Sequence, residues 1–259
     1  MSTTLPTISI SIVSHSQGQL LQPLLSDLDR HCTAYPLEVL LTLNLPEELP
    51  FDTGGFRFPV STHMNDAVHG FSENHDRAFV RSTGQLFCVM NPDIRIGMDV
   101  FAALHACLRE ETVGVVAPVV LNEAGSIEDS ARQFPTPLKI LCKALGGCRG
   151  SDYPVKDAIV HPDWVAGMFM LFRREVFDKL GGFDERYFLY YEDVDLCARL
   201  RLQGYQVALC PDAKVVHHAR RSSHRNLKYM GWHLASMFRF FFSAPFLKIC
   251  RSQSTRRSQ

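Results

Sequence analysis

Alternating and continuous hydrophobic runs divide the first part of the chain into strands separated by helices. Residues 8–13 alternate Ile and Ser and then give way to small polar residues, which is typical of a strand. Residues 19–32 carry leucines three and four positions apart, the spacing of one helix face, and residues 37–43 form a second apolar run. A strand, a helix and a strand in such quick succession predict a βαβ unit, and hence a parallel sheet covered by helices.

The same alternation continues, with one interruption. We expect further strands at 58–61, 85–90, 113–117, 164–172, 205–209 and 213–216. We expect further helices at 74–83, 100–109, 174–180 and 194–203. Residues 121–160 are polar and rich in Gly and Pro, so an irregular segment or a lid is predicted there. The order of the elements predicts an α/β fold.

Composition excludes several classes of protein. Of the 259 residues, 46% are hydrophobic and 21% are charged, which is typical of a globular protein rather than a disordered one. The 27 Lys and Arg balance the 27 Asp and Glu, so no nucleic-acid partner is indicated. The sequence has no membrane-spanning run and no signal peptide at Met1–Pro6, so we expect a cytoplasmic location. Its eight scattered cysteines are therefore expected to be mostly buried, reduced thiols.

The C-terminal tail has a different composition from the rest of the chain. Nine Lys or Arg residues and no acidic residue occur between Arg220 and Arg257, interleaved with aromatic and aliphatic residues. A basic, aromatic, helical segment favours binding to a membrane surface. The alternative is a C-terminal helix that packs on the core and turns its basic residues to water.

Three short motifs could carry chemistry. Asp93 follows the strand at 85–90, where an acid either binds a divalent cation or caps a turn. Glu192 and Asp193 open a predicted helix, where acids act as a general base or complement the helix dipole. His217 ends a predicted strand, as a metal ligand or a structural side chain. Together they suit a metal-bound diphosphate substrate and a separate base.

Longer stretches resemble a known family. The strongest runs from Trp164 as WVAGMFMLFRR and continues from Gly181 as GGFDERYFLYYEDVDLCAR. Supporting matches are GFSENHDRAF from Gly70, VMNPD ending at Asp93, and VVHH ending at His218 and followed by Ser222. From Ile8 to about Ser223 the chain resembles a family 2 glycosyltransferase of the bacterial rhamnosyltransferase branch.

The resemblance implies a GT-A fold, which is a Rossmann-like, mixed and mostly parallel sheet flanked by helices. It implies one domain over residues 1–225, with a nucleotide-binding half at 1–120 and an acceptor half at 121–225. Residues 226–259 then form an amphipathic, basic and aromatic-rich helical tail.

The resemblance also implies roles for the three motifs. Asp93 matches the acid that binds the metal, Mg²⁺ or Mn²⁺, on the donor diphosphate, and Asn91 replaces the first acid of that motif. Asp193 matches the base that deprotonates the acceptor hydroxyl, with Glu192 beside it as a second catalytic acid. His217 matches a histidine that completes the metal site.

Further residues are expected around the two substrates. Ser14, Asn44, Asn74 and Asp76 are expected on the donor side with Asn91 and Asp93, and Trp164 and Gly167 on the acceptor and sugar side. The chain departs from the family where residues 43–46 read Leu-Asn-Leu-Pro, because the aspartate that grips base and ribose is missing.

The implied activity is inverting, metal-dependent sugar transfer. The favoured donor is dTDP-L-rhamnose, and the acceptor is a lipid-linked or surface glycan at the inner face of the bacterial cytoplasmic membrane. Alternatives are a UDP-sugar donor or a degenerate, non-catalytic binding protein. Residues 14–18 contain one Gly and no basic residue, which disfavours a nucleotidyltransferase. The oligomeric state is not predicted.

Overall fold

A computed structural model describes residues 5–147, 150–155, 158–218 and 227–257. The strands are β1 (Ile8–Ser14), β2 (Leu37–Leu43), β3 (Val60–Met64), β4 (Leu86–Met90), β5 (Ile94–Arg95), β6 (Val113–Leu121), β7 (Ala131–Arg132), β8 (Trp164–Val165), β9 (Phe169–Arg173) and β10 (Gln206–His217). The helices are α1 (Gly18–His31), the 3-10 helix η1 (Thr53–Gly55), α2 (Phe71–Arg81), α3 (Phe101–Leu108), α4 (Pro137–Ala144), α5 (Arg174–Leu180), α6 (Glu192–Leu202), α7 (Leu227–Phe241) and α8 (Ala244–Arg257).

Within these ranges, eight strands form one sheet in the order β3-β2-β1-β4-β9-β6-β10-β5. Strands β3, β2, β1 and β4 run parallel, as do β6 and β10, whereas β9 and β5 pair antiparallel with their neighbours. Strands β7 and β8 form a separate antiparallel pair. The predicted mixed, mostly parallel sheet is confirmed.

Helices cover both faces of the sheet and create two cores. The alternation in β1 sends Ile8, Ile10 and Ile12 into the core under α1 and α3. Ser11 on the opposite face is also fully buried, but its Oγ lies 2.7 Å from His75 Nδ1, so its polar group is satisfied. The second core contains α5, α6 and buried side chains of the two C-terminal helices.

The topology gathers several strand ends at one edge. Strands β1, β2 and β4 run parallel and lead into Ser14, Asn44 and Asn91. Strand β9 runs the other way and begins where β4 ends, with Phe169 opposite Met90. The residues just before β9 therefore lie at the same edge as the residues just after β4.

Three predicted elements differ from the structure. Residues 121–160 are not wholly irregular, since they contain β7 and α4. The sequence pattern did not reveal α4, because a short apolar helix is hard to recognise among surrounding Gly and Pro. The strand expected at 164–172 is two strands, interrupted around Gly167. The strands expected at 205–209 and 213–216 are the single strand β10, with an irregularity between Cys210 and Lys214.

The cysteine prediction holds for most of the described thiols. Five free cysteines are buried and Cys250 is free and exposed, whereas Cys142 is disulfide-bonded, so the prediction is wrong there. The chain turns back directly after α4, where Gly147 N donates to Cys142 O at 2.9 Å.

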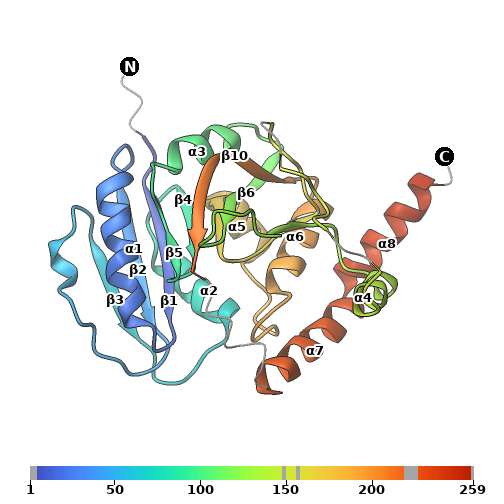
Figure 1. Cartoon of the computed structure of the whole chain (residues 1–259), viewed down its shortest axis with the longest axis horizontal. Coiled ribbons are helices and arrows are strands. Elements are labelled where there is room, and N and C mark those ends of the chain that lie inside the picture. The colour runs from blue at the N-terminus through green and yellow to red at the C-terminus, as the bar shows by residue number, and fades with distance from the viewer. Residues whose placement is uncertain (1–4, 148–149, 156–157, 219–226, 258–259) are drawn as a thin grey trace.

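The chain ends in α7 and α8, on the side of the molecule opposite α1 (Figure 1). Phe240, Phe246 and Ile249 anchor these helices in the second core. None of the helices in the described ranges has the length and apolar character needed to cross a bilayer. Ser222 and the predicted boundary at 225/226 lie outside the described residues.

Candidate active site

Two side chains predicted to share a metal site meet after β4. Asp93 immediately precedes β5, and antiparallel pairing of β5 with β10 places His217 opposite Ile94. His217 Nε2 lies 3.4 Å from Asp93 Oδ2, while His217 Nδ1 lies 2.9 Å from Glu128 Oε2. Asp93 Oδ1 is buried and has no hydrogen-bond partner within the described residues. A buried carboxylate oxygen beside an imidazole nitrogen suits a divalent cation.

Glu128 fixes the orientation of the imidazole. Burial lowers the pKa of His217, but the hydrogen bonds and negative charges of Asp93 and Glu128 outweigh burial and raise that pKa to about 9. With Nδ1 bonded to Glu128, Nε2 is the nitrogen that faces Asp93. In the part of the chain described, no three His, Cys, Asp or Glu side chains are grouped to hold a metal ion. A cation at Asp93 would therefore need oxygen ligands from a bound diphosphate.

The predicted base lies at the first turn of α6. Asp193 Oδ2 accepts a hydrogen bond from Gly167 N at 2.9 Å, and Oδ1 accepts one from Val194 N at 2.8 Å. Burial raises the pKa of Asp193, and the two amide hydrogen bonds only partly oppose this rise. Tyr190 and Tyr191 precede it with φ of 70° and 67°, a left-handed conformation that is uncommon for tyrosine. Such strained backbone clusters at functional sites.

Glu192 is buried beside the predicted base. Glu192 is only 4% exposed, and its Oε2 has no hydrogen-bond partner within the described ranges. Burial, followed by the negative charge of Asp193, raises the pKa of Glu192 well above its usual range. Two adjacent buried carboxyl groups disfavour two negative charges side by side, and the pKa of Asp193 is raised as well.

One short segment connects the base to the predicted metal site. Residues 166–168 lie between β8 and β9. Gly167 N donates to Asp193, and Met168 O accepts a hydrogen bond from Asn91 N at 2.9 Å. Because Asn91 is two residues before Asp93, the backbone that holds the base also holds the metal-side motif.

The structure brings together two of the residues predicted on the donor side, Asn44 and Asn74, whereas Asp76 contacts the residues after α5. Asn44 and Asn74 are joined through Asn65 Nδ2, which donates to both side-chain oxygens, at 2.8 and 2.7 Å. Asp76 accepts a hydrogen bond from Phe183 N at 3.0 Å. Burial raises the pKa of Asp76 to about 7.

Ser14 contacts an acid that the sequence did not single out. Ser14 Oγ donates to Glu47 Oε1 at 2.5 Å, and Gly18 N donates to Glu47 Oε2 at 2.9 Å. The loop after β2 lacks the expected aspartate but thus places a different carboxylate at the end of β1, beside the start of α1.

Comparison with known proteins identifies the family. The sequence profile described as "Glycosyltransferase like family 2" matches residues 66–232, which include Asp93, Glu128, Asp193 and His217. The chain belongs to glycosyltransferase family 2. The resemblance seen in the sequence is therefore confirmed.

Two similar family members are rhamnosyltransferases. N-acetylglucosaminyl-diphospho-decaprenol L-rhamnosyltransferase of Mycobacterium tuberculosis is 30% identical over 87% of this chain and 80% of its own length. Rhamnosyltransferase WbbL of Escherichia coli (strain K12) is 27% identical over 90% of this chain and 92% of its own length.

A solved structure confirms the GT-A fold. GalNAc-T7 with UDP, GalNAc and Mn²⁺ superposes with a TM-score of 0.67 at 16% identity. The match covers 85% of this chain but 45% of that one, so this glycosyltransferase spans less than half of its structural neighbour. At this identity the likeness shows the fold alone.

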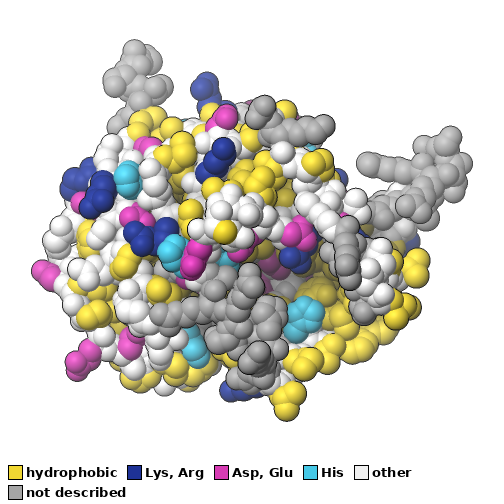
Figure 2. Space-filling model, in the orientation of Figure 1, with side chains coloured by type: hydrophobic (Ala, Val, Ile, Leu, Met, Phe, Trp, Pro, Cys, Tyr) yellow, Lys and Arg dark blue, Asp and Glu magenta, His cyan; other side chains and the backbone are white. Residues whose placement is uncertain are grey.

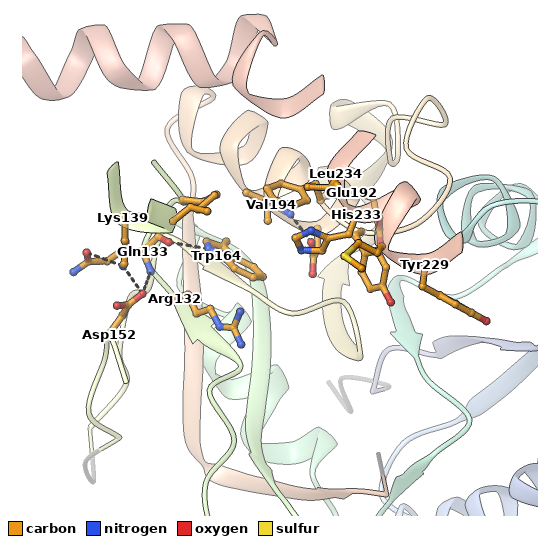
Figure 3. Close-up of a pocket in the computed structure, with 16 residues that line it drawn as sticks. Arg132, Gln133, Lys139, Asp152, Trp164, Glu192, Val194, Tyr229, His233 and Leu234 are labelled. Carbon is orange, nitrogen blue, oxygen red and sulfur yellow. Dashed lines mark hydrogen bonds and ion pairs between the residues drawn. The ribbon is translucent and has the colours of Figure 1, made fainter. Parts of the chain in front are cut away.

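The glycosyltransferase has a cavity of about 650 Å³ beside Asp193 (Figure 3). On one side lies Trp164, whose Nε1 donates to Gln133 O at 3.0 Å and whose ring centre is 5.5 Å from the Arg132 guanidinium carbon. On the other side, α7 contributes Tyr229 and His233.

Sequence reasoning identified Trp164 but missed Arg132, His233 and Glu128. Each lies in a stretch without a recognisable motif, and each reaches the site only through tertiary folding. The only available signal was the aromatic content of the tail, which we assigned to membrane binding.

Proposed function

We propose that this glycosyltransferase is an inverting, divalent-metal-dependent enzyme that transfers L-rhamnose from dTDP-L-rhamnose to a lipid-linked or surface glycan. The observation that carries the proposal is the shared backbone segment: Gly167 N binds the carboxylate of Asp193, and Met168 O binds the amide of Asn91. A base and a diphosphate site connected in this way suit single displacement at a sugar held between them.

Asp93 and His217 would hold the metal, because Asp93 Oδ1 has no partner among the described residues and His217 Nε2, once it gives up its proton as the cation binds, becomes a ligand. When bound, a divalent cation would neutralise the charge that develops on the departing diphosphate. Glu128 would keep His217 Nε2 turned towards that position through its bond to Nδ1. We leave open whether the metal is Mg²⁺ or Mn²⁺, since oxygen-rich sites accept both.

Asp193 would act as the base, assisted by Glu192. The carboxylate of Asp193 takes the proton of the acceptor hydroxyl as the acceptor oxygen bonds to the anomeric carbon. The bond from that carbon to the diphosphate oxygen breaks in the same displacement, so the anomeric configuration inverts. The two amide hydrogen bonds fix the direction of the carboxylate. Burial raises the pKa of Glu192 and so favours its neutral form beside the proposed base.

The substrates are inferred from the relatives and from the composition of the tail. The names of both rhamnosyltransferase relatives support L-rhamnose as the sugar, and one of those names specifies a diphospho-lipid acceptor. Ser14, Asn44, Asn74, Asp76 and Asn91 remain our proposed donor contacts.

Trp164 and Gly167 remain our proposed contacts on the acceptor side. The basic and aromatic helices α7 and α8 would bind the inner face of the bacterial cytoplasmic membrane, where a lipid-linked acceptor resides.

The test is a panel of nucleotide sugars, each with Mg²⁺ or Mn²⁺, monitored by thermal unfolding and by transfer to a diphospho-lipid-linked N-acetylglucosamine. At a hundredfold excess over Kd, a ligand that binds only the native state adds about 2.7 kcal/mol, or roughly 5–11 °C in Tm. A metal-dependent shift and transfer with dTDP-L-rhamnose support the proposal. A response to UDP-sugars alone discards the donor, and binding without any transfer favours the non-catalytic alternative.

A further inference from the structure

Helix α4 exposes an apolar face that the described part of the chain leaves uncovered. Leu138 is 77% exposed, Leu141 is 56% exposed, and Leu145, immediately after the helix, is 79% exposed. Their spacing of three and four residues places them on one side of the helix. Exposed leucines grouped in this way mark a surface for another apolar phase or partner.

Helix α7 carries a second apolar stripe. Leu227, Met230, Leu234 and Phe238 recur at helical spacing and are 81%, 53%, 45% and 56% exposed. The opposite face of the helix buries Phe240 in the second core, so the helix is fixed to the domain with the stripe outward. Figure 2 shows hydrophobic side chains gathered along the edge that α7 forms.

Both helices border the same cavity. The 650 Å³ cavity beside Asp193 is lined by Ile140 from α4 and by Met230 and Leu234 from α7. Met230 and Leu234 therefore belong both to the exposed stripe and to the cavity wall. The apolar surface outside is thus continuous with the cavity that contains the proposed base.

Cations outnumber acids beside these stripes, and the acid nearest α4, Asp152, is paired with Lys139 of that helix, with 2.6 Å between Asp152 Oδ2 and Lys139 Nζ. The sequence has no acidic residue between Asp129 and Asp152, around α4, and none after Asp212. Lys228, Arg239 and other cations accompany the second stripe. A second copy of the chain would bring the same charges against one another, because a two-fold interface joins identical patches. An anionic lipid surface instead complements both the cations and the apolar side chains.

We propose that α4 and α7 form one membrane-binding face, with an anionic phospholipid surface as its occupant, and that the acceptor cavity opens between them. The lipid part of the acceptor then stays in the bilayer while its sugar enters the cavity and reaches Asp193. The inference rests on the proposed lipid-linked acceptor. It adds α4, from the part of the chain expected to be irregular, as a second contact besides the tail.

The test uses the full chain and phosphatidylcholine vesicles with or without phosphatidylglycerol, in a co-sedimentation assay. The variant Leu138→Glu/Leu141→Glu changes two exposed residues that do not line the cavity. The control, Val80→Glu, changes a residue on α2 that is 79% exposed. We expect wild type and control to bind the anionic vesicles equally, and the α4 variant to bind about tenfold or more weakly. Thermal unfolding of each variant checks that it is folded.

Three outcomes would overturn the inference: an α4 variant that binds vesicles as wild type does, a wild type that does not bind anionic vesicles, or a dimer in sedimentation velocity that the α4 substitutions dissociate.

Transfer from dTDP-L-rhamnose to a short-chain, water-soluble diphospho-N-acetylglucosamine separates this inference from the proposed function. The α4 variant should retain that transfer. If the wild type binds vesicles normally but does not transfer rhamnose to the soluble acceptor, the proposed function alone is wrong.

Discussion

Replacing Asp193 by asparagine tests the proposed base with the smallest change in shape. Asparagine keeps the volume of the side chain but offers one carbonyl oxygen where the carboxylate offers two. In the structure both carboxylate oxygens are used, by Gly167 N at 2.9 Å and by Val194 N at 2.8 Å. One of these amides must therefore face the NH₂ group of Asp193→Asn, and the variant also cannot accept a proton from an acceptor hydroxyl.

The two consequences differ in size. Leaving one buried amide unsatisfied costs about 1–3 kcal/mol, which corresponds to a decrease of roughly 2–12 °C in Tm. Removing a partly buried charge offsets some of this loss. Loss of a positioned base lowers turnover about 10²–10⁴-fold. A domain with a stability of roughly 5–15 kcal/mol stays folded after the first loss, so reduced transfer at 25 °C reports on the chemistry.

The assay is steady-state transfer from dTDP-L-rhamnose, with donor affinity measured separately by thermal shift. The matched control is Glu192→Gln. Burial and the charge of Asp193 raise the pKa of Glu192 and favour its neutral form, which an amide resembles, and we expect turnover within about threefold of wild type. If Asp193→Asn turns over within about tenfold of wild type, or if Glu192→Gln loses as much as Asp193→Asn, the assignment of Asp193 as base is wrong.

Three further predictions follow from contacts in the site. Glu128→Gln should weaken Mn²⁺ binding about 10–100-fold, measured by electron paramagnetic resonance of free Mn²⁺, because His217 loses its orienting carboxylate; unchanged affinity would contradict this role. Trp164→Ala should raise the KM for acceptor roughly 2–12-fold and leave the donor KM unchanged; an equal rise in both would remove it from the acceptor side. The pKa of Asp76 is raised by burial to about 7 in the folded protein, above its ordinary value of 3.8, so the native state binds the extra proton and wild-type stability should fall as pH rises from about 4 to about 7. Asp76→Asn should abolish that fall in urea titrations across this range, and an unaltered slope would show that Asp76 is not its source.

The first βαβ unit could be predicted from sequence because its signals are local. The alternation of Ile8, Ile10 and Ile12 and the helical spacing of the leucines in α1 coincide with the faces that the structure buries. The strand end at Asp93 and the helix start at Asp193 were also visible locally, and the family resemblance joined them. The antiparallel pairing of β9 with β4, which the sequence did not predict, places Gly167 between them.

The remaining features depend on contacts between distant parts of the chain. Glu128 contacts His217 across 89 positions, and nothing in the sequence near Glu128 marks it as a site residue. Helix α4 was missed because its leucines are exposed, so they lack a buried, continuous pattern. Helix α7 buries Phe240 in the core, as the alternative of a packed C-terminal helix predicts, and leaves Leu234 at the surface.

The absence of a side chain at Gly167 connects these observations. A Cβ atom there would lie 3.2 Å from Phe71 Cζ and 3.6 Å from Asp193 Cβ, so the peptide is already enclosed by Phe71 and by the carboxylate side chain that it holds. Its amide holds the base, and the next carbonyl holds Asn91. A shift of this peptide would therefore move the base and the metal-side motif together, without altering either side chain. Because misplacement by about 1 Å can cost 10²-fold in rate, the backbone at 166–168 would set the geometry of the proposed base and the proposed metal site as directly as Asp193 and Asp93 themselves.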